Sequence, residues 1–215
     1  MTSVGALMAY AVVGMAHLVA IGVDADAVQW VTKALLMPLL ALYAALAARS
    51  RGETPSRLLL WALGWAWLGD IVLEYGGTAP LIAGMVCFFI GYGGYAVAFV
   101  RAGALSRLRL TVLCGYAAFV IAMLVWLWPG LSDQGLAIPM AFYAAMMAFL
   151  ASTAATLGAR IGAGGALLLL SDALIGVRLA EAADIPGQPY WVMLTYMLGQ
   201  ALVVTGWPHV RRGMR

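Results

Sequence analysis

Runs of apolar residues recur along the whole chain, separated by short stretches that are polar or rich in glycine. An apolar run of about 20 residues is long enough to cross a bilayer core as a helix, so each run predicts a transmembrane helix. Eight runs occur, at about residues 4–23, 28–48, 58–73, 80–100, 110–128, 136–157, 161–181 and 190–207. The pattern predicts an all-α polytopic membrane protein with eight transmembrane helices, formed as a single integral domain over residues 1–215.

The charged residues are few, and their positions predict an orientation. Only 10% of residues are charged and 65% are hydrophobic, so a soluble domain of this size could not cover its surface. Nearly all the arginines lie in the loops after the second, fourth and sixth runs and in the C-terminal tail. In the other loops, every charged residue is acidic. The positive-inside rule therefore places both termini in the cytoplasm, as expected for a protein of a bacterial cytoplasmic membrane. The net charge of +3 reflects these loops and does not indicate nucleic-acid binding.

A faint internal similarity relates the two halves of the chain. Residues 41–46 (ALYAAL) resemble residues 141–146 (AFYAAM), and Asp70 and Asp172 keep almost the same offset. Two parallel repeats of four helices, related by an axis along the membrane normal, would produce this pattern and would bring the two aspartates face to face. Alanine-rich segments also match by chance, so the pattern is equally compatible with a chain that has no repeat.

Several ionisable residues fall inside the apolar runs. Asp70 and Glu74 lie one helical turn apart near the end of the third run, Asp172 lies within the seventh, and Lys33 lies within the second. At a rise of about 1.5 Å per residue, Lys33 and Asp70 come roughly 9 Å below the outer surface and Asp172 near the midplane. A charge in this position is costly, so such residues usually face the protein interior and serve a function.

These residues are predicted to line one polar chamber that opens to the outer half of the membrane. Arg178 and Glu181 would join it from the outer end of the seventh helix, and Tyr196 and Gln200 from the eighth. Two carboxylates in an apolar chamber need not titrate alike, because desolvation and neighbouring charges differ between them. If one carboxyl group is protonated and the other ionised, the pair provides a proton donor and a base. This combination suits acid-assisted attack of water on an ether carbon.

Other chemistry has little support in the sequence. The only histidines are His17 and His209, no G-x-S-x-G motif occurs, and no His/Cys cluster has the spacing of a metal site. Cys87 and Cys114 lie in apolar runs and are interpreted as small buried hydrophobic residues. His17 stands alone on an apolar helix and is assigned no role. The sequence thus predicts no metal.

Purely structural roles are also open for these residues. Lys33 and Asp70 could form an ion pair that only joins two helices, and Arg178 and Glu181 a local pair near the headgroups. The polar side chains of Tyr143, Tyr196 and Gln200 could serve only as hydrogen bonds between helices.

The order of short motifs along the chain resembles the lysoplasmalogenase family of YhhN-like membrane proteins. The clearest matches are residues 165–172 (GALLLLSD), 32–38 (TKALLMP) and 68–70 (LGD). The remaining matches are single residues in the fourth, sixth and eighth runs: Gly84, Phe88, Tyr95, Tyr143, Tyr196 and Gln200. In one departure, Tyr92 stands where the family often has a histidine, which puts proton transfer or headgroup binding at that position in question.

The resemblance implies hydrolysis of the vinyl ether bond of a lysoplasmalogen to a fatty aldehyde and a glycerophospho-amine, without an organic cofactor. A bacterial member without access to plasmalogens would act on a different lysolipid. Asp70 and Asp172 are the expected acid–base pair, and Lys33 and Arg178 would hold the phosphate. The polar end of the site would be shaped by Glu74, Tyr143, Ser171, Tyr196 and Gln200. The single lipid tail would lie in an apolar groove between helices. The expected partners are the lysophospholipid and the bilayer, and the oligomeric state is left open.

Two other classes of function remain open at this stage. A proton-coupled transporter or a lipid-binding protein without catalysis would also carry intramembrane acids and a parallel repeat. An intramembrane aspartyl protease would share the Gly69-Asp70 pair, but Trp67 occupies the position of that signature's first glycine, and its partner motifs do not occur.

Overall fold

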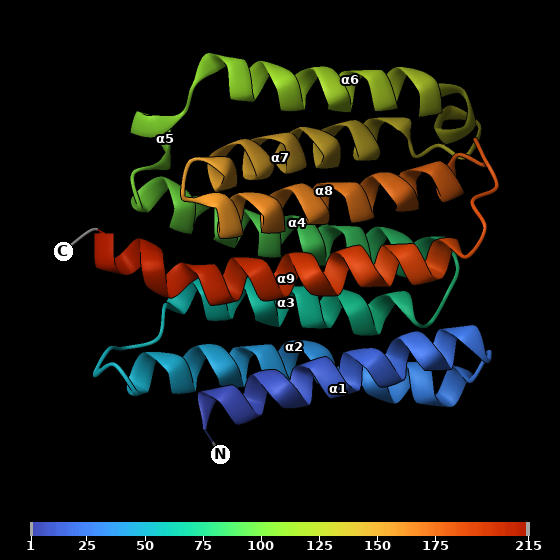
Figure 1. Cartoon of the computed structure of the whole chain (residues 1–215). Helices are drawn as coiled ribbons and strands as arrows, with labels where there is room; N and C mark the ends of the chain where they lie inside the picture. Colours follow the sequence, from blue (N-terminus) through green and yellow to red (C-terminus); the bar gives the residue numbers. More distant parts are fainter. Residues whose placement is uncertain (1, 214–215) are drawn as a thin grey trace. The chain divides into compact units, whose positions relative to one another are not determined.

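A computed structural model describes residues 2–213, and the regular structure within that range is entirely helical (Figure 1). Eight long helices and one short helix, α5, occur in it. Their bounds are α1 Ser3–Gly22, α2 Asp26–Arg49, α3 Arg57–Leu73, α4 Thr78–Arg101, α5 Ala104–Arg107, α6 Leu110–Asp133, α7 Ala137–Ala155, α8 Ala159–Leu179 and α9 Gln188–Gly213. Each predicted apolar run overlaps one long helix, so the all-α prediction is confirmed. Of the C-terminal arginines that support the predicted orientation, Arg215 lies outside the described residues, and so do the side chains of Arg211 and Arg212.

Six of the described helices are long and apolar enough to cross a membrane: α1, α2, α4, α6, α7 and α8. The helix α3 has 17 residues, which correspond to about 26 Å, slightly less than a hydrocarbon core of about 30 Å. The structure therefore describes a multi-pass membrane protein. The count of eight spans and the cytoplasmic position of the termini stay predictions.

Two helices continue beyond the ends that the sequence predicted. The helix α6 was expected to end near Trp128, but it includes Pro129 and runs to Asp133, and α9 likewise includes Pro208. A proline inside a helix costs one backbone hydrogen bond, which neighbouring segments can compensate near a helix end. Packing at Gly130 is tight, because a Cβ atom there would overlap the carbonyl of Ala180. The four-residue helix α5 was not predicted.

The chain divides into two compact units, residues 1–98 and 99–215. In the first unit, α1 packs on α2 and α2 packs on α3. The helix α4 packs on α3 through glycines: a Cβ atom on Gly91 would lie 3.0 Å from the Ala62 carbonyl, and one on Gly94 would lie 2.9 Å from Trp61. The small residues Gly91 and Gly94 thus allow α4 to approach α3 closely. The single domain and the internal repeat stay predictions.

In the second unit, α8 contacts three other helices, α6, α7 and α9 (Figure 1). Its glycines permit the closest approaches: a Cβ atom on Gly164 would lie 2.9 Å from the Gly199 carbonyl of α9, and one on Gly165 would lie 2.6 Å from the Ala154 side chain of α7. Small residues allow membrane helices to approach in this way. Asp172 is therefore carried by a helix that packs against three others in this unit.

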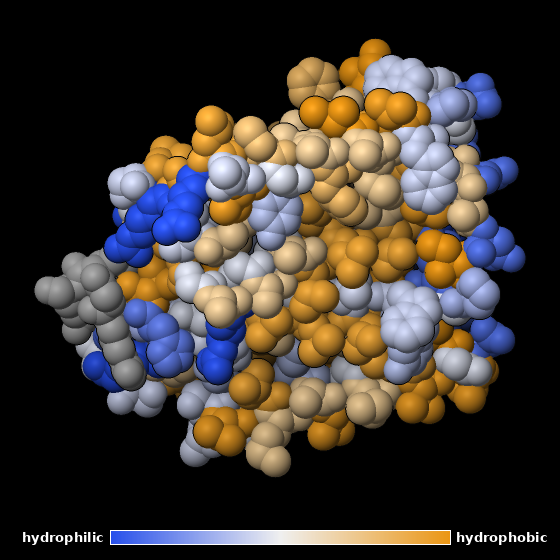
Figure 2. All heavy atoms as spheres, turned by 45° about the horizontal axis from the view of Figure 1, so that its top comes forward, coloured by the Kyte–Doolittle hydropathy of each residue, from blue (hydrophilic) through white to orange (hydrophobic). Residues whose placement is uncertain are grey.

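The exposed surface is largely apolar. Along α1 and its C-cap residue Val23, exposed side chains recur every three or four residues: Val4, Met8, Val12, Met15, Val19 and Val23. On α6, large exposed side chains include Phe119, Ile121, Val125, Trp126 and Trp128. Figure 2 shows hydrophobic side chains over most of the face that it displays. In water such a surface would cause aggregation, whereas in a bilayer it contacts the acyl chains.

Candidate functional site

The first unit carries an ion pair between α2 and α3. Lys33 Nζ donates to Glu74 Oε1 at 2.6 Å, and the two side chains are 14% and 24% exposed. Glu74 caps the C-terminal end of α3, and the chain turns away at Gly76 and Gly77, whose φ angles of +65° and +85° favour glycine. The ion pair considered from the sequence joined Lys33 to Asp70. In the structure the partner is Glu74, one turn further along α3.

Asp70 lies on the same helix and is only 2% exposed. It lies within electrostatic range of Tyr10 on α1, which in turn interacts with Tyr95 on α4. Both tyrosines are buried. The carboxylate thus faces the interior of the first unit, as the cost of a charge in a membrane predicts. Tyr10 was not anticipated, because nothing in its sequence neighbourhood distinguishes it from a core aromatic residue.

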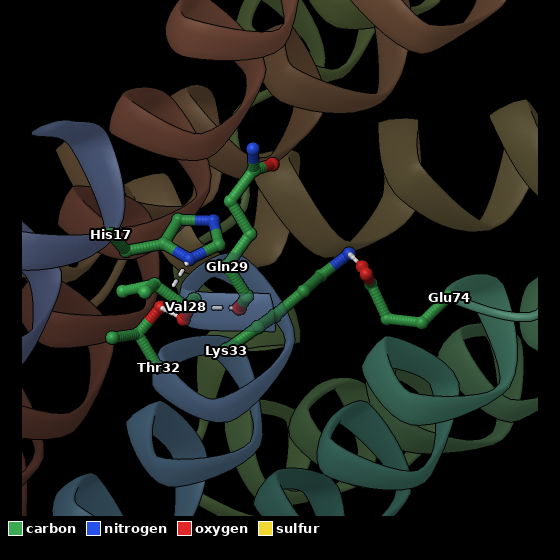
Figure 3. A network of polar contacts seen from close by, with 6 residues as sticks. All are labelled: His17, Val28, Gln29, Thr32, Lys33 and Glu74. Carbon is green, nitrogen blue, oxygen red and sulfur yellow. Dashed lines mark hydrogen bonds and ion pairs between the residues drawn. The ribbon is translucent and has the colours of Figure 1, made fainter. Parts of the chain in front are cut away.

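His17 on α1 belongs to a polar network with α2 (Figure 3). It is 2% exposed, and its Nδ1 lies 2.8 Å from Thr32 Oγ1. The Thr32 hydroxyl proton is directed to the carbonyls of Val28 and Gln29, at 2.6 and 3.1 Å. Since Thr32 Oγ1 must then accept from the imidazole, Nδ1 carries the ring proton and Nε2 keeps a lone pair.

His17 also interacts electrostatically with Lys33 and Glu74. Figure 3 shows Nε2 pointing away from Thr32, with the Lys33–Glu74 ion pair in the same region. The sequence analysis assigned His17 no role. Its position seven residues after Tyr10, on the same face of α1, was the only signal that could have suggested one.

In the second unit, Tyr143 on α7 donates from Oη to Asp172 Oδ2 on α8 at 3.0 Å. Tyr143 is buried and Asp172 is half-buried. Since one carboxylate oxygen is held by the phenol, the orientation of the other is restricted as well. The sequence predicted both residues, and the structure brings them together.

Asp172 and Tyr143 line a cavity of about 40 Å³ between α6, α7 and α8. A space of this size has room for a few water molecules, and these two residues are its polar partners. A larger apolar groove of about 530 Å³ lies between α6 and α8. Phe119 and Leu169 line both spaces, so the groove and the cavity adjoin at these two side chains. An apolar groove of this kind was expected for a lipid tail.

The other predicted residues occupy varied positions. Ser171 is buried and donates to the Val192 carbonyl at 3.0 Å, which joins α8 to α9. Tyr196 and Gln200 are both buried on α9. Arg178 and Glu181 are exposed at the end of α8. Their common chamber with Lys33, Asp70 and Glu74 stays a prediction, as does the pairing of Asp70 with Asp172, because these groups belong to two different units.

Over the residues that the structure describes, no group of three or more His, Cys, Asp or Glu side chains could hold a metal ion. The polar groups present are carboxylates, phenols, an amine and an imidazole, which suit proton transfer and the binding of a charged headgroup.

Apolar helices with carboxylates in their interior define the chain as a polytopic α-helical membrane protein with an ionisable core. The chain belongs to the YhhN family, whose pattern it matches over residues 28–207. The resemblance inferred from the motifs is thereby confirmed. The match begins within α2, so α1 with Tyr10 and His17 precedes it. No curated protein and no solved structure matches the chain.

Proposed function

We propose that the protein is a membrane lipid hydrolase that cleaves the vinyl ether bond of a lysoplasmalogen, releasing a fatty aldehyde and a glycerophospho-amine. The observation that carries the proposal is the position of Asp172. This carboxylate, bound by Tyr143, lines a cavity that adjoins an apolar groove. A reactive carboxylate beside space for water and for an alkyl chain is what hydrolysis of a single-chain lipid requires. Membership of the YhhN family supports the same chemistry.

The proposed reaction needs one acid and one base. The acid protonates the β-carbon of the vinyl ether, which leaves an oxocarbenium ion at the α-carbon. The base removes a proton from water as its oxygen bonds to that carbon, and the resulting hemiacetal breaks its bond to the glycerol oxygen, which takes up a proton. Asp70 and Asp172 supply the two roles in this proposal, in an order that is left open.

In this proposal the headgroup and the tail of the substrate bind toward opposite ends of the helices. Lys33 binds the phosphate, assisted by Arg178, and Glu74, Ser171, Tyr196 and Gln200 shape the polar end of the site. The groove residues of α8, namely Ala166, Leu169 and Leu170, all precede Asp172 in that helix. The tail therefore extends from Asp172 toward the N-terminal end of α8. In the predicted topology this end is opposite the membrane face at which α3 ends with Glu74.

The test is incubation of the purified, reconstituted protein with a panel of single-chain lipids, followed by mass spectrometry of the products. The panel should contain vinyl ether, alkyl ether and ester forms with the same headgroup. A fatty aldehyde from the vinyl ether form alone, absent with the Asp172→Asn variant, is the expected result. Release of a fatty acid from the ester form would contradict the proposed bond specificity. No product from any form would favour the alternative of a proton-coupled carrier or lipid-binding protein.

A further inference from the structure

The Lys33–Glu74 ion pair lies near one end of the first unit and can be reached from outside. Lys33 is seven residues from the start of α2 and Glu74 directly follows α3, so both lie within about 10 Å of the helix ends. The long Lys33 side chain can extend from this depth toward the interface, where a bilayer places its phosphate and amine groups. The partial exposure of the two side chains, 14% and 24%, is consistent with access for a headgroup.

The three polar side chains of this cluster offer a specific set of donors and acceptors. Lys33 uses one of its three ammonium protons on Glu74 Oε1, so two remain for phosphate oxygens. Glu74 Oε2 and the lone pair of His17 Nε2 can both accept. The tautomer that provides this lone pair is set by Thr32, whose hydroxyl proton is committed to backbone carbonyls.

We propose that Lys33, Glu74 and His17 form a headgroup site that selects a phosphoethanolamine lipid over a phosphocholine lipid. The inference rests on the proposed function, because it names the headgroup of the lipid that is hydrolysed. Lys33 binds the phosphate, while Glu74 and His17 Nε2 accept hydrogen bonds from the primary ammonium. A quaternary ammonium has no N–H to donate, and its recognition relies on aromatic faces instead. His17 is the specificity-determining residue, since a carboxylate alone attracts either cation.

The depth of Asp70 agrees with this placement. Asp70 lies one turn before Glu74 on α3, which corresponds to about 5.4 Å along the helix axis. In a lysoplasmalogen the vinyl ether follows the phosphate after the short glycerol backbone. A headgroup held at Glu74 therefore brings the reacting bond toward the level of Asp70.

The experiment measures binding of two saturated alkyl ether lysolipids, one with ethanolamine and one with choline, to the full-length protein in nanodiscs. These probes lack the vinyl bond, so they report headgroup selection without turnover. The wild-type protein should bind the ethanolamine probe about tenfold or more tightly, as expected for a hydrogen bond to a charged group. Equal affinities for the two probes would overturn the proposal, even if a vinyl ether lipid were hydrolysed. Selection without hydrolysis would instead contradict only the proposed function.

Variants of His17 separate its two nitrogens. In His17→Asn the amide can replace Nδ1 as the donor to Thr32 but offers nothing at the position of Nε2, so the preference for ethanolamine should be lost. In His17→Gln the amide oxygen can reach the position of Nε2, and the preference should be partly retained. The matched control is His209→Asn, the same substitution at an exposed histidine of α9, which should bind as the wild type does.

A series of probes with stepwise N-methylation provides a second measurement that needs no variant. Affinity should fall most at the last methylation, when the final N–H is lost. A gradual decrease with the size of the headgroup, or an undiminished preference in a folded His17→Asn protein, would show that His17 does not select the headgroup.

Discussion

The Tyr143 phenol donates a 3.0 Å hydrogen bond to Oδ2 of Asp172 across the interface of α7 and α8. Tyr143→Phe removes this donor but keeps the ring that lines the cavity. We expect kcat to fall about three- to tenfold with little change in KM, because the loss of a single hydrogen bond leaves the carboxylate less well oriented. Tyr43→Phe, at the equivalent position of the similar segment 41–46, is the matched control and should leave turnover unchanged. Equal effects of the two substitutions would show that Tyr143 does not act through Asp172.

Asp70→Asn and Asp172→Asn test the proposed acid–base pair. An amide keeps the shape of the side chain but cannot exchange the proton, so each variant should lose about a hundredfold or more in turnover. The double variant should be scarcely worse than the more impaired single one, because groups that act as a unit are strongly non-additive. If the two residues only stabilise the fold, the melting temperature will fall in place of the activity. Turnover near the wild-type rate in either folded variant would end the catalytic assignment.

The ion pair of Lys33 with Glu74 can be tested by a double-mutant cycle. Lys33→Met should raise KM before it changes kcat, since a phosphate anchor acts in the ground state and the transition state alike. It should also lower the free energy of unfolding by about 1–3 kcal/mol, because Glu74 keeps a partly buried charge without its partner. Adding Glu74→Gln should restore part of this stability but not the KM. If the double variant recovered both the stability and the KM of the wild type, the ion pair would have a structural role only.

Narrowing the groove between α6 and α8 should affect long lipid tails selectively. Gly115 lines the groove, and a Cβ atom there would meet no other atom within 4 Å. Gly115→Leu should therefore fold and should raise KM for a long-chain substrate more than for a short-chain one. Gly93→Leu is the matched control, because Gly93 has the same open surroundings on α4 and does not line the groove. A loss that is independent of chain length would indicate that the tail binds elsewhere.

The predicted orientation can be checked with reporter fusions at Asp133 and at the C-terminus. The alternation of arginine-rich and acidic loops predicts that these two points lie on opposite sides of the membrane, with the C-terminus in the cytoplasm. A glycosylation reporter and a cytoplasmic enzyme fused at each point should give complementary signals. The eight-span topology places three spans between Asp133 and the C-terminus. If both reporters were found on the same side of the membrane, the predicted count of eight spans would be wrong.

The sequence by itself determined the class of the protein, its helices and its family. Apolar runs and arginine-rich loops are local properties that depend only on the thickness and polarity of the bilayer. The free-energy cost of placing a charge in a membrane helix also identified Lys33, Asp70 and Asp172 as interior residues. Such residues rarely occur without a function. The tyrosine partner of Asp172 was among the predicted site residues as well.

The tertiary structure decided which of these groups meet. Asp70 and Glu74 share one face of α3, so helical periodicity cannot tell which of them binds Lys33; the relative shift of α2 and α3 places Glu74 at 2.6 Å. His17 and Tyr10 carry no local signal that separates them from core residues. They join the polar network only because the rotation of α1 turns them toward Thr32 and Asp70. Helix rotation depends on packing summed over the whole interface, and for that reason partners across helices emerge only from the folded chain.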